Sequence, residues 1–192
     1  MNGLATLVVA GSGEARSPRP DLFEARARTT VRYADPAAWI TAAAVAHALS
    51  GFRDQMTVSL HTVGMVVISD QGPTSTMAEV NAATSTGFSS PLRYAASSPG
   101  SLVGVTCIAF GFRGPTLNFT MPPEEGVPVA LQLCAGWLGR RVARYMVVAT
   151  FRGADLAAGF SRAVLLAHPE VAGEFGNPLT QSVANWLIQI CD

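Results

Sequence analysis

Residues 110–125 read FGFRGPTLNFTMPPEE, and this stretch decides how the chain is expected to fold. Gly114-Pro115 leads into a short run, Thr116–Thr120, whose composition predicts a strand. Met121–Gly126 is the turn after this strand, and the pattern of Val127–Arg140 predicts a helix. A strand that passes through a tight turn into a helix is typical of an α/β protein.

The rest of the chain repeats this alternation. Further strands are predicted at four apolar runs: Thr6–Ala10, Met65–Ser69, Tyr145–Thr150 and Ala163–Ala167. Further helices are predicted over Asp54–Thr62, Thr76–Ala83, Pro99–Phe110 and Pro178–Ile190, and between Asp35 and Gly51, where Asp35 is the N-cap and Pro36 the first helical residue. Gly11-Ser12-Gly13 predicts a turn after the first strand, followed by a loop to about Ala34. The expected fold is a layered α/β domain with a mainly parallel sheet and helices on both faces.

Composition narrows the classes of function. The 192 residues suit one domain, 1–192, and 49% are apolar while only 14% are charged. The net charge is zero and no basic stripe is present, so we expect no nucleic-acid partner. No run reaches membrane-spanning length and the start lacks the features of a signal peptide, so we expect a cytoplasmic protein without membrane contact. Such low charge favours self-association or a partner protein.

The residues that carry cofactor chemistry are sparse. All 13 basic residues are arginine, which excludes Schiff-base lysines and a lysine-bound pyridoxal cofactor. The three cysteines are far apart and indicate buried, reduced thiols: Cys107, Cys134 and Cys191. The three histidines have no metal-binding spacing: His47, His61 and His168. We therefore expect no metal and no cofactor.

The stretch 110–125 resembles the nucleophile turn of ketosynthases, the condensing enzymes of fatty-acid and polyketide assembly. In that family a Gly-Pro pair and a buried strand lead to a Thr-Ala-Cys-Ser-Ser-like turn that opens a helix. Counting from Gly114, the acyl-accepting cysteine of the family falls on Pro123. Other segments of Leu4–Thr150 are also similar to the family: VVISDQG at Val66–Gly72, Ser90-Pro91 with Tyr94 in an aromatic place, and Ala96–Gly104 before the turn.

The resemblance implies a thiolase-like half-domain, a single truncated ketosynthase-like domain that lacks the catalytic cysteine. Proline offers no nucleophile at position 123, and none of the three histidines matches the active-site histidines of the family. A functional condensing enzyme is therefore not expected. The resemblance favours a non-condensing partner or scaffold for acyl-carrier-bound intermediates or for an active ketosynthase, in a homodimer or heterodimer, as with chain-length-factor subunits of polyketide biosynthesis.

Two groups of charged residues leave alternatives open. Glu124 and Glu125 either interact with the helix dipole or serve as general acid or base in a repurposed cyclase, dehydratase or hydrolase that acts on a polyketide intermediate. An arginine cluster near the end of the same helix either satisfies the opposite end of the dipole or docks an acidic acyl carrier protein: Arg140, Arg141 and Arg144.

Overall fold

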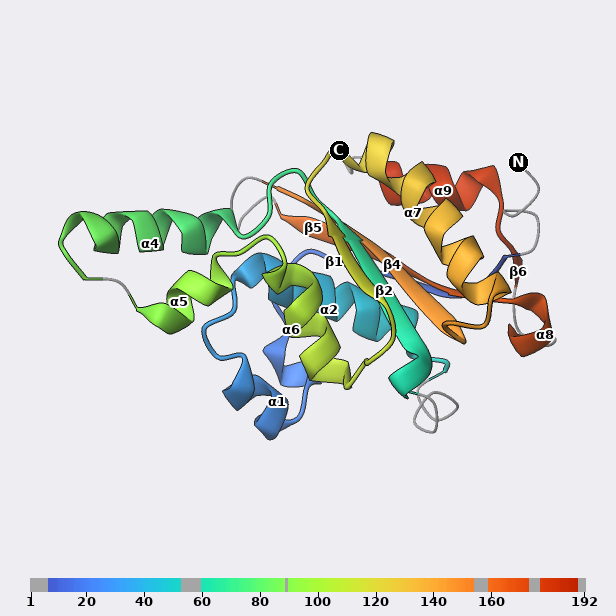
Figure 1. Ribbon diagram of the computed structural model, residues 1–192, viewed down its shortest axis with the longest axis horizontal. Helices are drawn as coiled ribbons and strands as arrows, with labels where there is room; N and C mark the ends of the chain where they lie inside the picture. Colours follow the sequence, from blue (N-terminus) through green and yellow to red (C-terminus); the bar gives the residue numbers. More distant parts are fainter. Residues whose placement is uncertain (1–6, 53–59, 89, 154–158, 173–176, 190–192) are drawn as a thin grey trace.

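A six-stranded sheet forms the centre of the computed structural model, which describes residues 7–52, 60–88, 90–153, 159–172 and 177–189 (Figure 1). The strand order is β3-β2-β4-β5-β1-β6. The strands are β1 (Val8–Ala15), β2 (Val63–Ile68), β3 (Thr116–Phe119), β4 (Tyr145–Arg152), β5 (Phe160–Ala167) and β6 (Asn177–Pro178). The five predicted strands therefore correspond to the five longer strands of the sheet, although the predicted and observed ends differ by up to several residues.

The sheet is mixed, so the prediction of a mainly parallel sheet is wrong in part. β2 pairs in parallel with β3 and with β4, whereas β5 is antiparallel to both β4 and β1. β6 is also antiparallel to β1. The reason lies between β4 and β5, where residues 153–159 are too few for a crossover helix, which needs a dozen or more residues. The chain must therefore reverse its direction there.

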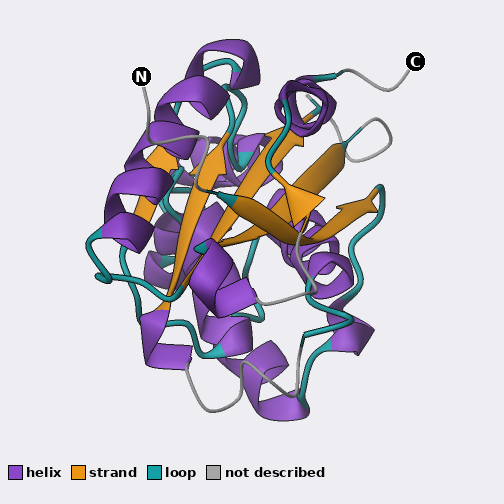
Figure 2. Ribbon diagram, turned by 90° about the vertical axis from the view of Figure 1, so that its right-hand side faces the viewer, coloured by secondary structure: helices purple, strands orange, loops and turns teal. Residues whose placement is uncertain are grey.

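Helices cover both faces of the sheet, as the sequence predicts (Figure 2). α2 (Pro36–Ala48) and α6 (Ser101–Phe110) lie on one face, and α7 (Pro123–Gly139) and α9 (Gln181–Ile188) lie on the other. Alternate residues of β2 divide between the two cores: Val67 packs toward α2 and α6, while Val66 and Ile68 pack toward α7. All six residues of β2 are buried, which explains its uninterrupted apolar sequence.

The turn predicted at Gly11-Ser12-Gly13 is wrong, because these residues lie inside β1. A Cβ atom on Gly11 would lie 2.1 Å from the carbonyl oxygen of Ala48, and one on Gly13 would lie 2.4 Å from the Ala48 nitrogen. The glycines therefore allow the backbone of α2 to cross β1 at close range. They serve helix–sheet packing and not a change of chain direction.

Asp35 caps α2 as predicted, and it also caps a second helix. Its carboxylate accepts a hydrogen bond from the Ala37 nitrogen at 2.8 Å and one from the Thr76 nitrogen at 2.8 Å. Thr76 lies in the first turn of α4 (Thr74–Ser85), which packs against α5 (Pro91–Ala96). Figure 1 shows that these two helices extend away from the sheet. The buried carboxylate thus joins this extension to the body of the molecule.

Several smaller predictions also need correction. The expected loop before Ala34 contains η2 (Pro20–Leu22) and α1 (Ala25–Thr30), which are too short to show an amphipathic period. α7 begins four residues before Val127, because a proline at the first position and acidic residues in the first turn favour a helix start.

Of the helix predicted over Asp54–Thr62, residues 54–59 lie outside the described part of the chain, and η3 (Leu60–Thr62) is a 3₁₀ turn. The predicted helix Pro178–Ile190 is shortened to α9, since Pro178 lies in β6 and Ile190 lies outside the described residues. A short helix, α8 (Pro169–Ala172), follows β5. In the described part of the chain, no helix is long and apolar enough to cross a membrane.

Candidate functional site

The turn between β3 and α7 lies where β2 and β3 end, at the carboxyl edge of the parallel strands. Ligands of open α/β sheets bind outside this edge. Pro123 is buried as the first residue of α7, where its fixed φ suits a helix start. A Cβ atom on Gly126 would lie 2.5 Å from Cγ2 of Ile68, so the first turn of α7 packs directly on β2. The turn is therefore held rigidly.

The first turn of α7 carries an ion pair. Glu124 binds the guanidinium group of Arg152, the last residue of β4. The pKa of Glu124 is lowered, first because its carboxylate accepts a hydrogen bond from its own backbone N–H, and further because of the bond and the charge of Arg152, while burial opposes the shift. Glu125, the second predicted site residue, lies beside it and is exposed. At neutral pH Glu124 is thus an ionised, already partnered carboxylate.

Sequence reasoning missed two arginines that bind the end of α9, one of which, Arg152, also binds Glu124 at this turn. Arg152 Nη2 donates to the carbonyl oxygen of Ile188 at 3.0 Å, and Thr150 Oγ1 donates to that of Leu187 at 2.9 Å. Arg162 of β5 donates to the carbonyl oxygens of Trp186 and, at 3.0 Å, of Gln189. These four carbonyls end α9 and lack partners within the helix. An arginine within an otherwise apolar strand was the available signal, since buried charges need partners.

The described thiols are poorly suited to nucleophilic chemistry. Cys134 is fully buried in α7 and Cys107 is partly buried in α6. Burial raises the pKa of the Cys134 thiol to about 12 and that of the Cys107 thiol to about 11. Both are therefore protonated near neutral pH, and a thiol is a much weaker nucleophile than a thiolate. Cys191 lies outside the described residues.

The histidines are dispersed. His47 in α2 makes a 2.7 Å hydrogen bond with the Glu14 carbonyl oxygen, and His61 lies in η3. His168 lies between β5 and α8. Within the described ranges, no three histidine, cysteine or acidic side chains are grouped so as to hold a metal ion.

The predicted arginine cluster lies at the other end of α7, about 25 Å along the helix from Pro123. Two of its members, Arg141 and Arg144, line a cavity of about 600 Å³, whereas Arg140 turns back and donates from Nε to the Gly136 carbonyl oxygen at 3.1 Å. The cavity lies between the end of α7, the segment that leads into β4, and α8. Its other lining residues are Thr62, Leu138, Gly139, Ala143, His168, Glu170 and Val171.

Arg141 has an unusual backbone. Its φ is +57°, and it is the one non-glycine residue with positive φ in the described part of the chain. The nitrogen of Arg141 donates to the Leu138 carbonyl, and that of Val142 donates to the Trp137 carbonyl at 2.9 Å. These bonds form a Schellman cap on α7, in which glycine is the usual residue at the left-handed position. An arginine there costs about 1 kcal/mol or more in backbone strain.

The comparisons with known proteins concern the fold. No protein-family model and no curated protein matches the chain. Among solved structures, the ishigamide ketosynthase/chain length factor matches 91% of this chain with a TM-score of 0.67 and 15% identity. A beta-ketoacyl synthase from Burkholderia phymatum STM815 matches 88% with a TM-score of 0.68 and 12% identity. A complex described as a type II PKS acyl-carrier protein with its ketosynthase bound to the hexaketide, AntDE:AntF, matches 86% with a TM-score of 0.67 and 17% identity.

The chain therefore shares the fold of ketosynthases and chain length factors. The matches span 60–64% of these three neighbours' own chains, so the neighbours are longer than the region of likeness. The sequence prediction of a ketosynthase-like fold is confirmed. The assignment of Pro123 to the nucleophile position and the docking of a carrier protein at the arginine cluster both stay predictions.

Proposed function

We propose that this protein is a non-condensing, ketosynthase-like member of a polyketide or fatty-acid-type pathway. It acts as a partner or scaffold for acyl-carrier-bound intermediates or for an active ketosynthase. One observation carries the proposal: the turn at the start of α7 holds Pro122-Pro123 and an ion-paired Glu124 where the resemblance places an acyl-accepting cysteine. The neighbours support it, because they include a ketosynthase/chain length factor and a carrier protein bound to its ketosynthase.

Neither of the two described cysteines lies at this turn to replace the missing nucleophile. Cys134 follows Pro123 by eleven residues along α7, which is about 16 Å, and its thiol is buried. A buried proline at the first position of the helix also fixes the backbone where a side chain would have to meet an acyl group. A protein built in this way can hold or cover an acyl chain but cannot accept it covalently at the turn.

The alternative is a rebuilt enzyme that uses Glu124 or Glu125 for proton transfer. The hydrogen bond from its own backbone N–H, and then the pairing with Arg152, keep Glu124 ionised, which disfavours it as a general acid. Neither carboxylate lines the cavity at the end of α7 or the smaller cavity, of about 220 Å³, between α4 and α5. Among the described residues, the ion pair of Glu124 and the positions of these two cavities give the enzyme no support.

Two measurements test the proposal. Incubation with an acyl carrier protein that bears a radiolabelled acyl group should leave the protein unlabelled, and a stable thioester at Cys107 or Cys134 would contradict the non-condensing role. Light scattering of the protein mixed with a ketosynthase or an acyl carrier protein of the same organism should then detect a complex. If neither protein binds at micromolar concentration, the partner role is wrong.

A further inference from the structure

The cavity at the end of α7 has an excess of positive charge. Arg141 and Arg144 line it together with one acidic residue, Glu170, so its walls carry a net charge of +1 when His168 is neutral. No carboxylate of the described residues forms an ion pair with Arg144, whose guanidinium carbon lies 5.9 Å from the centre of the Tyr145 ring. Arginine donors in a fixed planar fork are suited to carboxylate and phosphate groups.

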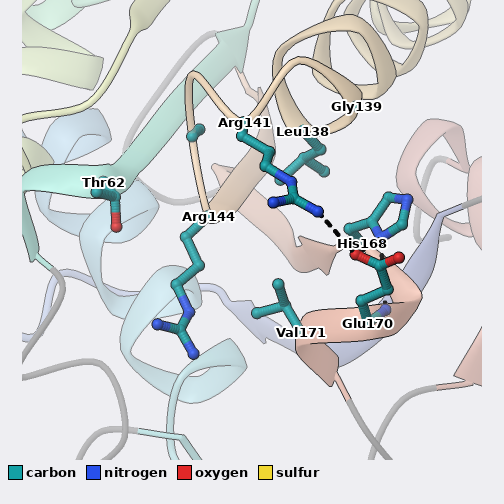
Figure 3. Close-up of a pocket in the computed structure, with 9 residues that line it drawn as sticks. Thr62, Leu138, Gly139, Arg141, Arg144, His168, Glu170 and Val171 are labelled. Carbon is teal, nitrogen blue, oxygen red and sulfur yellow. Dashed lines mark hydrogen bonds and ion pairs between the residues drawn. The ribbon is translucent and has the colours of Figure 1, made fainter.

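Arg141 can turn to an anion at little cost. Its Nη2 lies 3.3 Å from Glu170 Oε2, and the two side chains are 84% and 69% exposed. Figure 3 shows Arg141 directed at Glu170, while Arg144 extends away from that pair. An ion pair this exposed contributes little to stability, because water and salt screen it. If Arg141 leaves Glu170 to bind a ligand anion, the protein therefore loses almost no stability.

The backbone of Arg141 is an independent observation. The left-handed position after α7 favours glycine, yet it carries a long cationic side chain at the mouth of a cavity. Strain of this kind is found where a side chain is needed at one particular place. The cap on α7 would form at least as well with glycine, so the helix does not explain the arginine.

We propose that this cavity is a binding site for a small molecule that carries a phosphate or carboxylate group, with Arg144 as the anchor and Arg141 as the second donor. The volume of about 600 Å³ lies within the range of small-molecule sites. The buried Leu138 and Ala143, with the partly buried Val171, supply an apolar wall for the rest of the molecule. The site lies at the opposite end of α7 from the turn, and its two arginines belong to the cluster for which carrier-protein docking is predicted.

A small molecule is the proposed occupant, because Arg141 and Arg144 line the same cavity while Arg140 folds back onto α7. All three arginines are exposed, so binding of an acidic protein is one outcome of the test below. Arg140 is a matched control. Changing Arg140 or Arg144 to glutamine removes one positive charge at nearly the same place, but only Arg144 lines the cavity.

Calorimetric titration with inorganic phosphate, methyl phosphate and acetate, at constant ionic strength against chloride, tests the site. We expect saturable binding of phosphate or acetate, and the tighter of the two identifies the chemical group. Arg144→Gln should weaken that binding about tenfold or more, because a charge-assisted hydrogen bond is lost. Arg140→Gln should leave it unchanged.

Arg141→Gly provides a second readout. It should weaken anion binding while Tm stays the same or rises by about 2–4 °C, because strain at the left-handed position is relieved. The proposal is wrong if no small anion binds more tightly than chloride, or if Arg140→Gln and Arg144→Gln have equal effects. Binding of an acidic carrier protein that depends on Arg144, without any binding of small anions, would also overturn it.

Discussion

Replacing Arg152 with alanine should weaken the connection between α9 and the start of α7. Arg152 binds Glu124 on one side and the Ile188 carbonyl oxygen on the other, and its side chain is only 16% exposed. The bond to the carbonyl involves a charged, mostly buried donor, and such a bond contributes about 1.5–3 kcal/mol. The ion pair adds about 0–1 kcal/mol, because Glu124 is 49% exposed. The expected loss is about 1.5–4 kcal/mol in the free energy of unfolding.

Urea denaturation measures this loss, with Glu124→Gln as the control. The control removes only the ion pair and should cost about 1 kcal/mol or less. Hydrogen exchange of the α9 amides should become faster in Arg152→Ala, while exchange in α2, on the opposite face of the sheet, stays unchanged. If Arg152→Ala costs no more than Glu124→Gln, the arginine does not hold α9 and the reasoning fails.

Three further changes test other parts of the structure. The double variant Glu124→Gln, Glu125→Gln should lose about 1 kcal/mol or less in the free energy of unfolding and leave pathway output intact. Because the pKa of Glu124 is lowered in the folded protein, its contribution to stability is present above the unfolded pKa of about 4.3. That contribution disappears as the pH falls through the folded pKa. A folded double variant that binds its partner but yields no product would favour the enzyme. Asp35→Ala should lower the free energy of unfolding, measured by thermal denaturation, by about 2–4 kcal/mol, since two helix N–H groups lose their acceptor. A loss below about 0.5 kcal/mol would refute the double cap. Asn118→Pro or Thr120→Lys should weaken self-association or partner binding, because β3 is the strand at one edge of the sheet. If light scattering finds that the wild-type protein alone is a monomer at micromolar concentration, the homodimer is refuted.

Local sequence predicted the elements whose burial is uniform. β2 and most of β4 lie between two helical layers, so nearly every residue is apolar and the strand is visible in the sequence. The direction of β5 was not visible, because it depends on the length of the connection from β4. Gly11 and Gly13 of β1 look like turn residues in the sequence. Their role in the close packing of α2 on β1 is visible only in the structure.

The candidate site was predictable only in part. Glu124 and Pro123 stand in the stretch that sequence reasoning singled out, and both lie in the first turn of α7. Arg152 could not be assigned, because its partners are 28 and 36 residues away in the chain. The cavity at the end of α7 likewise combines three separate segments, of which the sequence marked only the arginine cluster and His168.

The double cap at Asp35 has a consequence for how this fold can vary. α2 is buried against the sheet, whereas α4 belongs to the helical extension, and a single carboxylate closes the first turn of both. α2 cannot shift along its axis without carrying Asp35 away from Thr76, and α4 cannot shift without losing the same acceptor. The orientation of the extension is therefore fixed by α2, a largely buried helix. Insertions in α4 and α5 can change the length of the extension more easily than its point of attachment.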